Sequence, residues 1–394
     1  MISVHEGCGA TIESALAAAE QGISSPRLII FLLNGHELAY VAEHLHCKYP
    51  DITTMGICSS IYANGHVNHA SVLLLAFDDD TAACSGIIHG LSQCPVQSIQ
   101  QFEQDVLQID PGKENTLCLE FCTGSEETLV TTLNAVLEEY DIPLIGTTVY
   151  GDVYHSGYVV AWNGQLWKDS CIYAIIRNRR GRIKLFNENI YGPRPGAPMH
   201  IATQVDRQKK ALVELDGQPA AEVYSKELGI PIEDTVANVM MHPLGRIVGN
   251  HVFTFSMRDQ LPDGTLYNFK QINRNDAICL LELKDYKKIF RETIARIKAE
   301  VPQIAFVFSI DCVYRYMLYE TLGCRKDYAR LMNSLGGPHV GATGAGEQIN
   351  NQHVNQNMVC AVFEDATPKG GVRCRTGRIL SNSGKSRRLR KSIR

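Results

Sequence analysis

Apolar and polar positions along the chain follow a repeated order: an apolar strand, an amphipathic helix, a second strand, a glycine-containing segment and a further apolar strand. Short apolar runs bounded by turn formers are typical of buried strands, and helices between them can cover one side of a sheet. The pattern predicts an α/β fold in which repeated strand–helix–strand units form layered mixed sheets. The three clear copies begin at Arg27, Thr116 and Ile304 and end at Phe77, Ile176 and Phe363.

Glycines recur after the second strand of each copy, where we expect loops. Glycine permits positive φ or a close backbone approach, and such loops can leave amide N–H groups free for an anion or a carbonyl. The alternative is that these glycines only turn the chain between packed elements. A weaker fourth copy is expected from a helix at 219–228 to a strand at 277–283. The expected loop glycines are Gly56 in the first copy, Gly146 and Gly151 in the second, and Gly341, Gly344 and Gly346 in the third.

The length of 394 residues exceeds what a single core usually holds, so two domains are expected. Prolines and glycines gather at 191–198, which is typical of a connection between domains. We therefore place an N-terminal domain at 1–190 and a C-terminal domain at 200–365. The Asp-Gly pairs at 216–217 and 263–264 predict tight hairpins within the second of these.

The last segment, 366–394, contains ten Lys or Arg and no acidic residue. The rest of the chain therefore carries 28 basic against 42 acidic residues. A polar, basic segment with few apolar residues is expected to be disordered when free. It could dock on an acidic partner, an anionic membrane surface or nucleic acid, or it could only aid solubility.

Thirteen cysteines are scattered along the chain and mostly lie in or beside apolar strands. No CxxC pair occurs, so reduced core thiols are expected rather than disulfides or a structural zinc site. No apolar run is longer than 28–33, which is far shorter than the ~20 residues of a membrane span. The N-terminus has no signal-peptide pattern, and the cytoplasm is the expected compartment.

Several short motifs lie in the order and spacing of one known family. The chain resembles the FIST family from about Arg27 to Phe363, which implies an N-terminal and a C-terminal FIST domain. The motifs are Met55-Gly-Ile-Cys-Ser-Ser-Ile61, Pro143-Leu-Ile-Gly-Thr-Thr-Val-Tyr-Gly-Asp152, His242-Pro-Leu-Gly245, Phe308-Ser-Ile-Asp-Cys-Val-Tyr-Arg315, Val340-Gly-Ala-Thr-Gly-Ala-Gly-Glu347-Gln-Ile349 and His353-Val-Asn355-Gln-Asn357.

The resemblance implies a cytoplasmic sensor of a small ligand in bacterial signal transduction rather than an enzyme. The chain has no kinase, cyclase or methyl-accepting region of its own, so the signal would pass by contact to a separate protein. The implied partners are a histidine kinase, a cyclic-di-GMP enzyme or a chemoreceptor, and a homo-oligomer is compatible with the sequence. Part of the family resembles haem-binding nitric oxide sensors, whereas an amino acid or another small carboxylate is the alternative ligand.

The family motifs also supply candidate ligand-binding residues. Arg315 follows an apolar strand, and its guanidinium can grip a carboxylate with two hydrogen bonds. Glu347 could pair with Arg315 or with a ligand amine, and Asn355 could supply amide contacts. Gly341 and Gly346 would offer backbone N–H groups, and Cys312 could be a reactive thiol or a core residue.

If haem b is bound, it would be noncovalent because no CxxCH motif is present. His242 and His339 lie in family-matched motifs, and His44 shares a helical face with His36 and Tyr40. Further options for the axial ligand are His66, His69 and Cys94.

Two rival functions belong to other classes. A thiol or acid–base enzyme would use Cys312 with Glu347, although no local triad and no P-loop or metal motif accompanies them in the sequence. An adaptor would use the basic tail to bind a partner.

Overall fold

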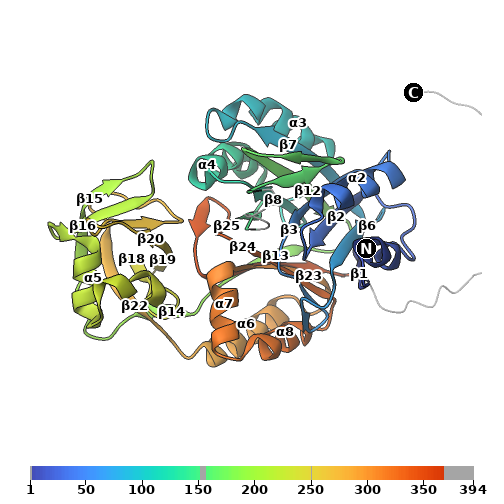
Figure 1. Ribbon diagram of the computed structural model, residues 1–394. Coiled ribbons are helices and arrows are strands. Elements are labelled where there is room, and N and C mark those ends of the chain that lie inside the picture. The colour runs from blue at the N-terminus through green and yellow to red at the C-terminus, as the bar shows by residue number, and fades with distance from the viewer. Residues whose placement is uncertain (1, 151–156, 250, 368–394) are drawn as a thin grey trace, which may run out of the picture.

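The computed structural model describes residues 2–150, 157–249 and 251–367. Across these residues the chain forms an α/β fold with four sheets, which confirms the predicted fold class (Figure 1). No helix in the described ranges has the length and apolar character needed to cross a membrane. Gly151 and most of the basic tail, 368–394, lie outside the described residues.

Three successive segments of the chain have the same order of elements. The first unit contains β1 (Ile2–Gly7), α1 (Ile12–Ala19), β2 (Leu28–Leu33), α2 (Leu38–Lys48), β3 (Thr53–Cys58), the hairpin β4 (Tyr62–Ala63) and β5 (His66–Val67), and β6 (Val72–Phe77). The second contains β7 (Thr81–His89), α3 (Ile99–Gln108), β8 (Thr116–Cys122), α4 (Glu126–Leu137), β9 (Leu144–Thr148), the hairpin β10 (Val160–Trp162) and β11 (Gln165–Trp167), and β12 (Ser170–Asn178). The third contains β13 (Ile183–Asn189), α6 (Tyr286–Glu300), β23 (Ile304–Cys312), α7 (Val313–Thr321), α8 (Arg325–Asn333), β24 (His339–Gly344), the hairpin β25 (Glu347–Ile349) and β26 (Gln352–Val354), and β27 (Asn357–Glu364).

Each unit builds four strands of one sheet in the same spatial order. The orders are β1-β6-β2-β3, β7-β12-β8-β9 and β13-β27-β23-β24. In each sheet the second and third strands of the unit in chain order, such as β2 and β3, lie side by side and are parallel. The other neighbouring strands are antiparallel. The predicted copies therefore correspond to real repeats, and each also has an additional edge strand before its first helix.

The hairpin of each unit pairs with the sheet of a different unit. Strand β10 of the second unit pairs with β3 of the first, and β25 of the third pairs with β9 of the second. The circle closes because β4 of the first unit pairs with β24 of the third. Every one of the three sheets thus has six strands, two of them supplied by another unit.

The inner faces of the three sheets share one apolar core. Ile30 of the first sheet, Phe121 of the second and Phe308 of the third all belong to it, and the rings of Phe121 and Phe308 lie 6.4 Å apart. The outer faces pack against helices: α1 and α2 cover the first sheet, α3 and α4 the second, and α6, α7 and α8 the third (Figure 1). The repeats therefore form one body, which we call the repeat core.

A fourth sheet is inserted within the third unit, between β13 and α6. It consists of β14 (Tyr191–Pro193), β15 (His200–Asp206), β16 (Ala211–Leu215), β17 (Gln218–Pro219), β18 (Leu244–Val248), β19 (His251–Phe255), β20 (Met257–Gln260), β21 (Leu266–Asn268) and β22 (Ala277–Leu283), with α5 (Ala220–Leu228) packed on it. We call it the inserted sheet. The proline-rich stretch at 191–198 is where the chain passes into it from β13.

The expectation of a weak fourth copy is wrong. The strand after α5, β18, pairs antiparallel with β22, and the other pairings of the inserted sheet are antiparallel too. A helix between two apolar runs looks the same in sequence whether the strands end up parallel or antiparallel. The two Asp-Gly turns are confirmed, because they join β16 to β17 and β20 to β21.

The expectation that the recurring glycines form loops is wrong for Gly344, which is the last residue of β24, and for Gly56, Gly146 and Gly341 inside strands. The latter three lie inside β3, β9 and β24, each directly beside a residue of the neighbouring parallel strand, namely Phe31, Glu120 or Ser309. A Cβ at Gly146 would lie 2.0 Å from Glu120 Oε1, and one at Gly56 would lie 2.5 Å from the Phe31 ring. These glycines leave room for side chains of neighbouring strands where another unit's hairpin joins the sheet.

We predict that Gly146→Ala lowers the free energy of unfolding by about 1–3 kcal/mol, because the added methyl overpacks the site. The three atoms nearest to the methyl would all be side-chain atoms of Glu120, within 2.6 Å. Adding Glu120→Ala should therefore recover part of the loss. The double mutant should lose less free energy of unfolding than the two single mutants lose together. Urea denaturation of the four proteins measures this, and strictly additive losses would contradict the explanation.

Candidate functional site

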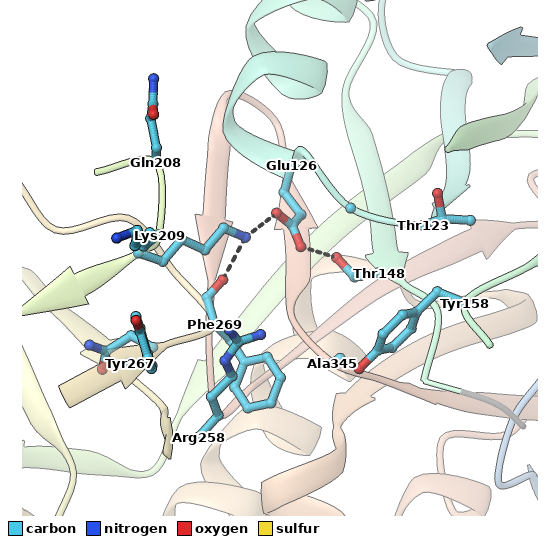
Figure 2. Close-up of a pocket in the computed structure, with 13 residues that line it drawn as sticks. Thr123, Glu126, Thr148, Tyr158, Gln208, Lys209, Arg258, Tyr267, Phe269 and Ala345 are labelled. Carbon is cyan, nitrogen blue, oxygen red and sulfur yellow. Dashed lines mark hydrogen bonds and ion pairs between the residues drawn. The ribbon is translucent and has the colours of Figure 1, made fainter. Parts of the chain in front are cut away.

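A cavity of about 460 Å³ lies between the repeat core and the inserted sheet (Figure 2). Both parts of the molecule contribute to its wall. The lining residues are Thr123, Gly124, Glu126, Thr148, Tyr158, Gln208, Lys209, Lys210, Arg258, Tyr267, Asn268, Phe269 and Ala345.

The core side of the cavity forms where two parallel strands end. Strands β8 and β9 run parallel, and their carboxyl ends carry Thr123 and Thr148. The chain turns sharply from β8 into α4 through Gly124, at φ 148°, and Ser125, which is left-handed. Open sheets bind ligands at such strand ends, where loops and helix N-termini converge.

The opposite side comes from one turn and two strands of the inserted sheet. The turn between β15 and β16 brings Lys209 and Lys210, and strands β20 and β21 bring Arg258 and Tyr267. The guanidinium of Arg258 lies 5.6 Å from the centre of the Tyr267 ring. Figure 2 shows Arg258 and Glu126 on opposite sides of the cavity, with the Tyr158 ring at one flank.

An ion pair joins the two sides. Lys210 Nζ lies 2.5 Å from Glu126 Oε2 and donates a second hydrogen bond to the carbonyl of Phe269 at 2.9 Å. The Thr148 hydroxyl donates to Glu126 Oε1 at 2.8 Å. Burial raises the pKa of Glu126, but the nearby His353 and Lys210 outweigh this and lower it overall. The carboxylate is therefore charged although Glu126 is only 4% exposed.

Glu127 and His353 extend this polar cluster beneath the cavity wall. His353 Nδ1 lies 3.1 Å from Glu127 Oε1, which also accepts a hydrogen bond from the Gln271 amide at 2.8 Å. Burial raises the pKa of Glu127, but the hydrogen bond and charge of His353, with Lys210 and the Gln271 amide, bring it to about 2. Sequence reasoning missed Glu126, Glu127 and Lys210. The Thr-Gly-Ser-Glu turn after an apolar strand was the available signal for the first two.

Arg315, the strongest candidate from the sequence, is fully buried in the third unit. Its guanidinium pairs with Glu188 and, at 2.8 Å, with Asp311. The rings of Phe290, Tyr319 and Tyr328 lie within 5.5 Å of it. Protein carboxylates thus take the contacts that a ligand carboxylate was expected to make.

Glu347 and Cys312 are brought together, as the rival enzyme hypothesis requires. The Cys312 thiol is in hydrogen-bond contact with Glu347, whose Oε2 accepts from the Asn357 amide at 3.2 Å. Both side chains are buried, and burial raises the pKa of each well above its ordinary value. The pair is therefore a neutral thiol beside a neutral carboxyl, which is not the thiolate that a nucleophile needs.

The other candidate ligand residues are separated. Gly341 lies inside β24 beside Ser309, whereas Gly346 follows β24 with φ 154° and faces the His353 ring. Asn355 is fully buried, and its Nδ2 donates to the carbonyl of Val354 at 3.1 Å. Of the six candidates, Gly346 and Asn355 lie at the cluster formed by Glu127 and His353.

The three histidines proposed for haem lie in different places and do not fit a porphyrin site. His339 is fully buried in β24, its Nε2 is 2.8 Å from the Ser309 hydroxyl, and burial lowers its pKa to about 3. His44 Nε2 lies 3.0 Å from Glu20 Oε1. His242 is half-buried, and none of the three lines the cavity of Figure 2. Haem binding through them is a sequence-based prediction that this geometry does not favour.

Comparison with known families gives two matches. A model of the FIST N domain matches residues 27–218, and a model of the FIST C domain matches residues 220–350. The comparison with curated proteins gives no match to the chain. The division between the two models falls inside the inserted sheet, so the third unit begins in the first matched segment and continues in the second.

We predict that Glu347→Gln makes stability less dependent on pH. Because burial raises the folded-state pKa above 4.5, the folded protein keeps a proton that the unfolded chain releases. Stability is therefore lost as pH rises above the unfolded pKa, by at most about 1.4 kcal/mol per pH unit for this one group. Urea denaturation between about pH 5 and pH 8 should show a shallower fall for the variant, whereas Glu43→Gln, at an exposed residue, should match the wild type. An unchanged slope in Glu347→Gln would contradict this assignment.

Proposed function

This chain belongs to the FIST family, whose domains sense small ligands in signal transduction, and we propose that the cavity between the repeat core and the inserted sheet is its ligand site. The volume of about 460 Å³ suits a small molecule. The cavity also combines aromatic walls with convergent charged groups, which is the usual character of small-molecule sites.

The charges at this site favour a small zwitterion, and we propose an amino acid. Arg258 and Lys209 offer positive charge to a carboxylate from the inserted sheet, and Glu126 offers a buried carboxylate to an ammonium group. Tyr158 and Tyr267 provide apolar and aromatic surface for a side chain. A purely anionic ligand would be repelled by the charged carboxylate of Glu126.

The ion pair between Lys210 and Glu126 is the observation that carries the proposal. It ties a turn of the inserted sheet to the N-terminus of α4 across the cavity. A ligand ammonium that binds Glu126 competes directly with Lys210, so an occupied site and an empty site differ in the contact between the two parts. That differential contact is what allows ligand binding to shift a conformational equilibrium.

A separate protein would then respond to the changed contact between the repeat core and the inserted sheet. A histidine kinase, a cyclic-di-GMP enzyme or a chemoreceptor fits this role, because each is regulated by contact with a sensor. In this scheme the chain acts by binding and not by catalysis, and ligand and partner affect one another's affinity equally.

A thermal-shift screen of the amino acids tests the proposal. One or a few should raise the melting temperature in a concentration-dependent way, because a ligand that binds only the folded state stabilises it. Arg258→Ala should weaken that ligand by about tenfold or more through loss of a charge-assisted hydrogen bond.

Arg274→Ala is the matched control, since Arg274 is an exposed residue of the inserted part that does not line the cavity. It should bind like the wild type. The assignment fails if no amino acid stabilises the protein, or if the two arginine variants bind a stabilising ligand equally well.

A further inference from the structure

Beneath the cavity, Glu126, Glu127 and His353 bring three potential metal-ligand atoms close together. These atoms, two carboxylate oxygens and an imidazole nitrogen, all lie within 4.8 Å of one another. The two glutamates come from the N-terminus of α4, and His353 comes from the hairpin that the third unit adds to the second sheet. The hairpin exchange therefore assembles the cluster.

We propose that this cluster is a binding site for a divalent transition-metal ion, with zinc as the best-fitting probe. Two carboxylates and one imidazole form a mixed oxygen and nitrogen donor set, which suits Zn²⁺ and Mn²⁺. An imidazole disfavours Ca²⁺ and Mg²⁺, which take oxygen ligands. Three protein ligands leave further coordination positions for water or a bound molecule.

A polar contact at the other ring nitrogen of His353 supports a preformed metal site. The amide of the fully buried Asn355 lies 3.5 Å from His353 Nε2, and its Oδ1 has no hydrogen-bond partner among the described residues. Metal-ligating histidines are held at their other ring nitrogen by such polar groups. If the Asn355 amide rotates, Oδ1 can accept the Nε2 proton and leave Nδ1 free to bind a metal.

Gly346 makes this polar contact possible. A Cβ there would lie 2.3 Å from His353 Nε2 and 3.1 Å from Asn355 Nδ2. Its backbone, at φ 154°, is also one that other residues rarely adopt. The family-matched glycine thus creates the space in which the imidazole and the amide meet.

The Lys210 ammonium lies beside the two carboxylates that we assign to the metal ion. It is 2.5 Å from Glu126 Oε2 and 4.0 Å from Glu127 Oε2. Glu127 Oε2 has no hydrogen-bond partner among the described residues, so it is available as a further donor atom. A divalent ion would replace one positive charge by two, displace Lys210 into the cavity that it lines, and neutralise both carboxylates.

Zinc binding to the full chain, stripped with a chelator, tests the site by isothermal titration calorimetry. We expect one equivalent to bind. Glu127→Gln and His353→Gln should each lower the affinity by about tenfold or more, since each removes a direct ligand. Lys210→Met should raise it, because it removes the competing ammonium while keeping all three ligands.

His251→Gln controls for adventitious binding, because His251 is exposed on the inserted sheet. The proposal is overturned if this variant loses as much affinity as His353→Gln, or if Glu127→Gln and His353→Gln bind zinc like the wild type. Circular dichroism checks that each variant is folded.

X-ray absorption spectroscopy of the wild-type zinc complex identifies the ligand atoms without any variant. It therefore tests the proposal even if a variant does not fold. It should show oxygen and nitrogen ligands with one imidazole, and sulfur ligands would place the ion on the cysteines instead. The metal site does not rest on amino-acid binding. Both proposals use Glu126, but His353 does not line the cavity and Arg258 is not a metal ligand, so variants of these two residues let the proposals fail separately.

Discussion

The exchange of hairpins among the three repeats is the constraint on which the rest of the structure depends. Each unit makes four strands of a sheet, and another unit supplies the last two. The donated strands cover the backbone edges of β3, β9 and β24, which would otherwise be open to pairing with other chains. Because the exchange is circular and the inner faces share one core, no unit is complete by itself.

The candidate site is a product of the same exchange. The hairpin β25–β26 carries His353 to the start of α4, and Ala345, just before this hairpin, lines the cavity. The inserted sheet then closes the opposite side with Lys210 and Arg258. The cavity lining thus combines acidic Glu126 of the second unit with cationic residues of the inserted sheet, which explains why groups of opposite charge meet at one place.

The sequence predicted the repeats well because buried strands and amphipathic helices have distinct apolar periods. It misplaced several glycines that lie in strands. A large neighbour on the adjacent strand, such as Glu120, explains a glycine at such a place, and the sequence does not show which residues are adjacent. It favoured Arg315 for its guanidinium, its place after an apolar strand and its family-matched motif, but one of the two carboxylates that occupy it, Glu188, is 127 residues away. The cavity was missed for the same reason, since Lys210 and Glu126 are 84 residues apart and nothing local links them.

The central claim is that a ligand in the cavity changes the contact between the inserted sheet and the repeat core. Hydrogen exchange measured by mass spectrometry, with and without a stabilising amino acid, tests it most directly. The account predicts slower exchange at both 122–127 and 206–210, the two turns that face each other across the Lys210–Glu126 pair, with little change in the core strand β23. Protection confined to one of these turns, or located on another face of the molecule, would contradict it.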